Sequence, residues 1–377
     1  MTTAGQRLAA LDTLTAILRQ ESAAPWPEHP DAWEALLDLA AHHALLPAVW
    51  SAWRATGRPV LPDDAARALE RFAPLGRGVP EIVLRRAYES SAARTERLLA
   101  AGVDVLRQLD AAGIPAVPLK GLHMLLAGVW TDPAARTMAD LDVLVPQSAA
   151  DDAFALLRAG SFQEHPEPIG EHADHHLPML ARGDVTLELH TELLVSRWSG
   201  LAPASDVLAR ASRRDTAAGA FVLASDTDTF VHLVAHAQLQ DETYRLLGVP
   251  LRALFETALL LRVAHDIDDA DVTRRFATHG VSHVLAAHLD ASRRMFDAPV
   301  DVPSNVRTVA HRLAVDVAVT EPRAQEAWAY LTRLPGSFSE SRMTEEFGPS
   351  GGSAWLWRAR ARHAGRRVRA RLRERSD

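Results

Sequence analysis

The stretch Leu119-Lys120-Gly121, followed downstream by Asp140-Leu141-Asp142-Val143-Leu144-Val145, decides the fold. Lys120 is the only lysine in the chain, and every other permanently positive side chain is an arginine. A lysine kept in such a chain indicates that a compact, mobile ammonium is needed, because a planar guanidinium is not equivalent to it. Lys120 precedes a glycine at a predicted strand-to-helix turn, and the two aspartates open a predicted apolar strand. Together they predict phosphate chemistry beside a small sheet.

The pattern around this stretch changes from helical spacing to short alternating elements. Strong turn residues separate them: Gly113 before the first strand, Pro146 after the aspartate strand, and Arg182-Gly183-Asp184 inside a hairpin. The order strand, helix, strand, helix, strand and hairpin predicts a small mixed sheet flanked by helices. The predicted elements are strands at 114–118, 141–145, 162–164, 177–181 and 185–190, and helices at 121–129 and 149–159.

The flanking regions are helical by apolar periodicity. The N-terminal region includes a long predicted helix at 81–112, and the C-terminal region returns to helix from residue 205 onward. The C-terminal helices are predicted at 226–239, 250–265, 271–279, 282–296, 306–319 and 324–334. The prediction is therefore an α+β chain with four parts: an N-terminal helical region at 1–112, a core at 113–200, a C-terminal helical domain at 201–340, and a linker with a basic tail at 341–377.

Composition narrows the class of protein. The 377 residues are 47% hydrophobic and 24% charged, which is typical of globular proteins, and the net charge of -7 gives no overall case for nucleic-acid binding. The chain has no cysteine, so disulfides, thiolate metal sites and cysteine nucleophiles are excluded. No run of apolar residues reaches 18, so no transmembrane helix is expected. These features predict a cytoplasmic protein.

Asp140 and Asp142 are the first candidate metal ligands. Residues two apart on a strand point to the same face, roughly 6.5 to 7 Å apart, and hard oxygen ligands are those that Mg²⁺ prefers. The apolar neighbours predict a buried strand, where carboxylates are costly unless they are paired or bind metal. The alternative is an ordinary capping or turn pair at the mouth of the strand.

Glu188 and three further residues extend this candidate site. Glu188 lies between apolar residues in a predicted strand, and if that strand pairs beside the aspartate strand, three carboxylates meet. Gly121 would let a ligand approach the backbone, Lys120 would supply a mobile charge, and Arg136 would hold phosphates from the intervening loop. Each residue alone is compatible with an ordinary turn, strand face or surface arginine. The turn lacks the spacing of a P-loop.

These residues resemble a known family. Leu119-Lys120-Gly121, Arg136, the aspartate strand through Pro146, and Leu187-Glu188-Leu189-His190 are similar to the uncharacterised bacterial nucleotidyltransferase family of the polymerase-beta-like nucleotidyltransferase superfamily, over residues 33–261. The resemblance implies that Asp140, Asp142 and Glu188 bind metal. The phosphate turn of the superfamily is usually Gly-Ser, and Lys120-Gly121 stands in its place here.

Several histidines and the C-terminal tail leave alternatives open. His172, His175, His176 and His190 form a loose group that is compatible with zinc or with ordinary loop and strand positions, and His190 shares the strand face of Glu188 and could touch substrate. His232 and His236 are interpreted as contacts within the helical core. The tail at 355–375 holds nine arginines and could bind RNA or an anionic membrane surface, or simply be a solvated helix.

The sequence therefore predicts a Mg²⁺-dependent nucleotidyltransferase. An NTP such as ATP would donate its nucleoside monophosphate to an unidentified acceptor, and pyrophosphate would leave. Asp140, Asp142 and Glu188 would be catalytic and would bind the metal, and Lys120, Gly121, Arg136 and His190 would bind the nucleotide. The alternative is a non-catalytic nucleotide-binding or protein-interaction module. Nucleic acid would bind only through the tail.

Overall fold

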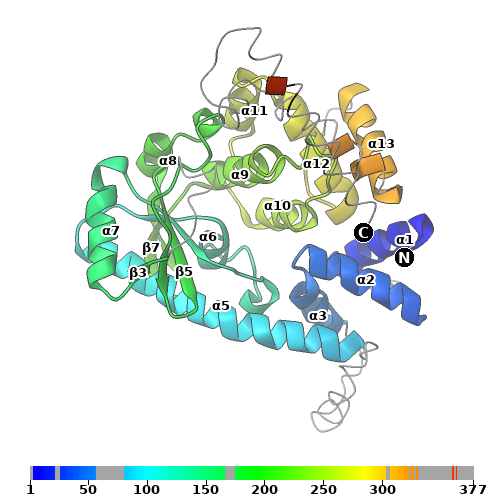
Figure 1. The fold of residues 1–377 in the computed structure, drawn as a ribbon, viewed down its shortest axis with the longest axis horizontal. Helices are drawn as coiled ribbons and strands as arrows, with labels where there is room; N and C mark the ends of the chain where they lie inside the picture. Colours follow the sequence, from blue (N-terminus) through cyan, green and yellow to red (C-terminus); the bar gives the residue numbers. More distant parts are fainter. Residues whose placement is uncertain are drawn as a thin grey trace.

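The small mixed sheet expected from the sequence is present in a computed structural model of the protein. The structure describes residues 3–21, 26–56, 80–165, 175–302, 306–321, 324–326, 328–329, 359–360 and 362. The expected α+β class is confirmed: helical regions come before and after the sheet along the chain (Figure 1).

Five strands form the sheet in the order β1-β2-β5-β4-β3. β2 and β5 run parallel, whereas the other neighbours are antiparallel. A parallel pair needs a long crossover connection, which here contains helix α7 (Ala150–Ala159). Gly183, with φ of 64°, lies in the turn between β4 and β5, where a glycine adopts left-handed backbone without strain. The strands are β1 (Val117–Pro118), β2 (Leu141–Leu144), β3 (Gln163–Glu164), β4 (Leu180–Arg182) and β5 (Val185–His190).

Two helices cover the sheet beside its central strands. The long helix α5 (Pro80–Ala111) extends from the sheet to the N-terminal helices (Figure 1), and α6 (Lys120–Leu126) follows β1 directly. Gly102 of α5 allows a close approach to α6, because a Cβ atom there would lie 2.8 Å from the methyl groups of Leu122. All four residues of β2 are buried as a result.

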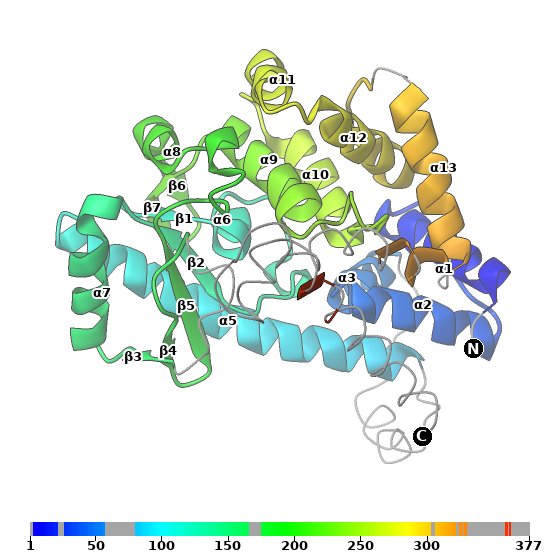
Figure 2. The same ribbon diagram turned by 45° about the horizontal axis from the view of Figure 1, so that its top comes forward.

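The N-terminal helices pack against the C-terminal region. They are α1 (Ala4–Leu18), α2 (Pro30–His42) and α3 (Leu46–Ala55), and α1 begins with a capping box formed by Thr3 and Gln6. α1 lies beside α13 (Val306–Thr320) (Figure 2), and Arg7 donates to the carbonyl of Thr320 at 2.7 Å. Buried apolar residues of both ends and of the sheet form one continuous hydrophobic core.

The predicted C-terminal helices are confirmed for the most part. The exception lies at 226–239, where α9 (Asp226–Ala235) ends early and the chain continues as a single π-helical turn, η5 (His236–Gln240). The residues described at 324–326 and 328–329 are helical. The remaining helices are α10 (Leu251–Val263), α11 (Asp269–Thr278) and α12 (Ser282–Phe296).

The purely helical prediction after residue 205 is wrong at one place. After α8 (Ala204–Arg210), strands β6 (Ser212–Thr216) and β7 (Gly219–Leu223) form an antiparallel hairpin. Phe221 and Leu223 alternate toward the core, and β7 packs beside β1. Two buried apolar residues in alternation are too few to distinguish a strand from a helix in an alanine-rich segment, so the sequence did not predict this hairpin.

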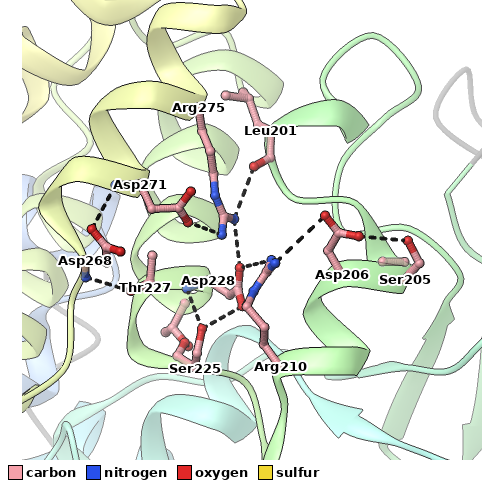
Figure 3. A network of polar contacts seen from close by, with 12 residues as sticks. Leu201, Ser205, Asp206, Arg210, Ser225, Thr227, Asp228, Asp268, Asp271 and Arg275 are labelled. Atoms are coloured by element: carbon pink, nitrogen blue, oxygen red, sulfur yellow. Dashed lines mark hydrogen bonds and ion pairs between the residues drawn. The ribbon is translucent and has the colours of Figure 1, made fainter.

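A buried carboxylate fixes α8, α9 and α11 together (Figure 3). Asp228 is fully buried, and its oxygens accept from Arg210 of α8 and Arg275 of α11 at 2.8 to 2.9 Å. Ser225, the N-cap of α9, also donates to Asp228 at 2.6 Å. A buried charge with such partners is far costlier to disrupt than an exposed one. This network therefore anchors the helices that border the sheet.

The basic tail predicted at 341–377 lies outside the described residues, apart from 359–360 and 362. The four-part division of the chain stays a prediction. Of the helices that the structure describes, none combines the length and apolarity required to cross a membrane.

Candidate functional site

Two predicted site residues meet across the parallel strands. In the register of β2 and β5, Asp142 is the partner of Glu188, and Leu144 is the partner of His190. Glu188 and His190 are two apart on β5 and therefore share a face. Nε2 of His190 lies 2.9 Å from Oδ1 of Asp142 and 3.3 Å from Oε2 of Glu188. The imidazole thus bridges the two carboxylates.

Lys120, the first residue of α6, contacts the same carboxylate of Asp142. The amide of Leu119 donates to the carbonyl of Asp142 at 2.9 Å, so the turn before α6 is joined directly to β2. Nζ of Lys120 lies 2.6 Å from Oδ1 of Asp142. Lys120 adopts φ of 43°, a left-handed conformation that is uncommon for a residue with a side chain. The Asp142 side chain is 2% exposed and that of Lys120 is 29% exposed, so the ammonium borders solvent.

The charges of this cluster shift one another. Burial alone would raise the pKa of Asp142, but Lys120 and His190 outweigh it and hold the pKa well below its usual range. A hydrogen bond from His190 lowers the pKa of Glu188. Burial opposes protonation of His190, yet the hydrogen bonds to Asp142 and Glu188 raise its pKa. Both carboxylates are therefore ionised at neutral pH.

Asp140 lies just before β2 and has a different environment. Burial raises its pKa, and the neighbouring charge of Asp142 raises it further. Asp140 is therefore close enough to Asp142 and Glu188 for their charges to interact. It is not part of the tightest ligand group, in which one atom each of Asp142, Glu188 and His190 lie within 4.8 Å of one another.

Arg136 lies next to the Lys120 turn, but it is paired elsewhere. Its side chain is 7% exposed, and Nε donates to Oε1 of Glu256 on α10 at 2.8 Å. A Cβ atom on Gly121 would lie 2.4 Å from Nη1 of Arg136, so only glycine leaves room for this guanidinium. The structure thus gives Gly121 a packing role and Arg136 a buried ion pair, neither of which the sequence indicated.

The other predicted histidines lie near the site without forming a described zinc centre. His175 and His176 have ring centroids 5.4 and 5.6 Å from His190, and His176 forms a β-bridge with His190. His172 lies outside the described residues. Within the described ranges, the one group of potential metal ligands found is that of Asp142, Glu188 and His190.

His232 of α9 is buried, as expected for a contact within the helical core, and charges of the site act on it. Burial lowers its pKa well below 6.5, and the charges of His236, Lys120 and His190 lower it further. The interpretation of His232 and His236 as core contacts rested on the lack of a glutamate next to His232 in the helix. The i, i+4 relation of the two histidines was the one available signal of a site.

The residues present fit a divalent cation. Asp142 and Glu188 are ionised oxygen donors on a rigid pair of strands, Asp140 adds a third carboxylate nearby, and Lys120 already brings a cation to Asp142. A concentration of carboxylates in a buried site is costly without positive charge. The arrangement is suited to binding a metal together with an anionic phosphate group.

Comparison with known proteins agrees with this geometry. Among proteins of curated function, none matches the sequence. Residues 29–297 match the profile of a family described as "Uncharacterised nucleotidyltransferase", so the match extends from α2 through α12 and includes the whole site. The resemblance expected over residues 33–261 is confirmed and extends further at both ends. Because the matched segment is well over half of the chain, the protein belongs to this nucleotidyltransferase family and is a transferase enzyme.

Proposed function

We propose that the protein transfers a nucleoside monophosphate from an NTP to an acceptor at the site of Asp142, Glu188 and Lys120. The observation that carries this proposal is the β2–β5 register, which brings two ionised carboxylates and a lysine together. In the reaction, an acceptor oxygen bonds to the α-phosphorus and the bond from that phosphorus to the bridging oxygen breaks. Pyrophosphate leaves with the bonding electron pair, and the acceptor loses a proton.

Asp142 and Glu188, with Asp140, would hold a divalent cation, and their hard oxygen atoms favour Mg²⁺. When bound, the cation supplies Lewis-acid stabilisation of the charge on the phosphates. His190 orients both carboxylates through Nε2. In this proposal the histidine acts on the ligands of the metal, in addition to the nucleotide-binding role predicted from the sequence.

Other side chains have roles that their exposure supports. Lys120 is partly exposed, so its ammonium can turn from Asp142 to the β- and γ-phosphates, together with the Gly121 amide. Arg136 is buried and paired with Glu256, so it supports the Lys120–Gly121 turn by contact. Glu188 is 17% exposed and ionised, so it is the carboxylate available to accept the proton of the acceptor.

The test is a transfer assay with NTP labelled at the α-phosphate and cell extract as the source of acceptor. The wild-type protein should label an acceptor and release pyrophosphate, whereas Asp140→Ala/Asp142→Ala should do neither. Asp184→Asn is the matched control, because Asp184 is an exposed carboxylate on the β4–β5 turn and pairs only with Arg97 among its described ion-pair partners. Equal labelling by the double variant would refute the proposed site.

A further inference from the structure

Helix α9 approaches the site through a contact with α6. Nε2 of His123 on α6 lies 3.0 Å from Oγ1 of Thr229 on α9, and both groups are buried. Lys120 lies one helical turn before His123, and His232 lies one turn after Thr229. This contact brings the turn of α6 that begins at Lys120 against the part of α9 that holds His232, and the charges of Lys120, His190 and Asp142 act on the pKa of His232.

His232 has a buried nitrogen that lacks a partner. The residue is 5% exposed, and within the described part of the chain Nε2 forms no hydrogen bond. Leaving a buried polar group unpaired is costly. Such a cost is expected where a ligand supplies the missing partner, and the site next to His232 is the one proposed to bind a nucleotide.

The helix that carries His232 is distorted and held in place just beyond it. The π-helical turn η5 begins at His236, and π-helical turns occur frequently at functional sites. Nε2 of Gln238 in this turn contacts Nδ1 of His288 at 2.9 Å, and Nε2 of His288 contacts Oγ1 of Thr257 at 2.8 Å. The side-chain oxygen of Gln240 accepts from the amide of Val195 at 3.1 Å. These contacts join η5 to α12 and to the segment that follows β5.

The chemistry next to His232 favours an anionic ligand. The groups whose positive charge acts on it are Lys120 and His190, which share the single carboxylate of Asp142, and His236, which lies 3.3 Å from Asp241. Nε2–H of an imidazole can donate to a phosphate oxygen. His232 and His236 belong to no described group of metal ligands, so a second metal is not indicated.

We propose that His232, contributed by the C-terminal helical region, binds the polyphosphate chain of the nucleotide together with Lys120. This inference rests on the proposed function and adds to it a residue from outside the sheet. It also assigns α9 to the wall of the nucleotide site, so the helical region supplies part of the substrate contact.

The test measures binding of inorganic tripolyphosphate by isothermal titration calorimetry, without metal, to the full chain. His232→Gln should weaken binding about tenfold or more, because a hydrogen bond to a charged group is lost. Lys120→Gln should weaken it comparably. His279→Gln is the matched control, since His279 lies at the end of α11 and its Nδ1 donates locally to the carbonyl of Arg275. It should bind as the wild type does.

The outcomes separate this inference from the proposed function. If Lys120→Gln weakens tripolyphosphate binding and a folded His232→Gln does not, His232 does not bind the polyphosphate chain, and the proposed function stands. If the wild type binds neither tripolyphosphate nor NTP and transfers no label, both fail. Should His232→Gln not fold, His232→Asn and the imidazole ¹⁵N resonances of the wild-type protein decide the matter. A tripolyphosphate-induced shift of the His232 Nε2 resonance supports the inference, and an unchanged resonance overturns it.

Discussion

Asp142 and Glu188 are register partners on parallel strands, and a single imidazole nitrogen lies within 3.3 Å of both carboxylates. The pair is thus positioned by the register of the two strands in the sheet. His190 shares β5 with Glu188, so a change in strand register would move both together. The two carboxylates and their bridging group therefore behave as one unit.

Metal affinity should follow from this unit. Glu188→Gln removes a charged ligand while keeping its shape, so it should weaken Mn²⁺ binding by at least about tenfold. Even the mutation of residues that hydrogen-bond to a metal ligand typically weakens metal binding by about that factor. The measurement is the free Mn²⁺ signal in electron paramagnetic resonance. Glu192→Gln is a useful control, because Glu192 follows β5 and accepts from the amide of Ala204. Unchanged Mn²⁺ binding by Glu188→Gln would contradict the assigned ligand role.

The ion pair of Arg136 and Glu256 should be worth more than a surface pair. Both side chains are at most 7% exposed, so removing one partner leaves a buried charge. Arg136→Met should lower the free energy of unfolding by ~3–5 kcal/mol, and Arg136→Met/Glu256→Met should lower it by less. Urea denaturation of the two single variants and the double variant measures the coupling. Strictly additive losses would show that the pair contributes no mutual stabilisation.

Gly121→Ala tests the packing of the phosphate turn. The added methyl would collide with Nη1 of Arg136, and Glu256 holds the same guanidinium through Nε. The variant should therefore lose ~1–3 kcal/mol of stability. Gly5→Ala is the control, since nothing lies within 4 Å of that position in α1 and alanine should favour the helix. Thermal unfolding compares the two. Equal melting temperatures would mean that Arg136 moves away freely.

Buried neutral histidines should make the protein sensitive to acid. Burial lowers the pKa of His288 from its ordinary 6.5 to about 3, so in that range the unfolded chain binds more protons than the folded one. The stability is complete above about pH 6.5 and is lost progressively as the pH falls toward about 3. His123, whose pKa burial lowers to about 4, adds to the same trend.

The melting temperature between pH 7 and pH 4 tests this dependence. His288→Leu should be less stable than the wild type at pH 7 by ~1–3 kcal/mol, because the side-chain amide of Gln238 loses its contact with His288, whereas Thr257 still donates to the carbonyl of Ala253. Its decline toward pH 4 should be shallower, since one titrating group is gone. A decline as steep as that of the wild type would assign the acid sensitivity to other groups.

Much of the sheet followed from local sequence signals. Alternating apolar residues, Gly183 and Pro146 predicted the hairpin and the aspartate strand, and strand geometry then placed Glu188 where a third carboxylate was needed. The order of the strands also agreed with a mixed sheet. These signals operate within a few residues of one another, which is why they are readable from one sequence.

Long-range partners could not be predicted in the same way. Nothing near Arg136 in the sequence indicates Glu256, and nothing near His123 indicates Thr229, because these contacts form only when α10 and α9 pack against the segments that carry Arg136 and His123. The π-helical turn η5 likewise depends on side chains from α10 and α12. The site residues assigned from the sequence stay predictions until the proposed variants are assayed.

The parallel pairing of β2 and β5 has a consequence for the kinetics of folding. Asp142 and Glu188 are joined by a crossover that includes α7 and the β4 strand, so their contact closes a long loop, and such contacts form slowly. A refolding chain would regain helix before it regains this register. Recovery of metal binding should therefore lag behind recovery of the far-ultraviolet circular dichroism signal, and the delay would report the closure of the sheet.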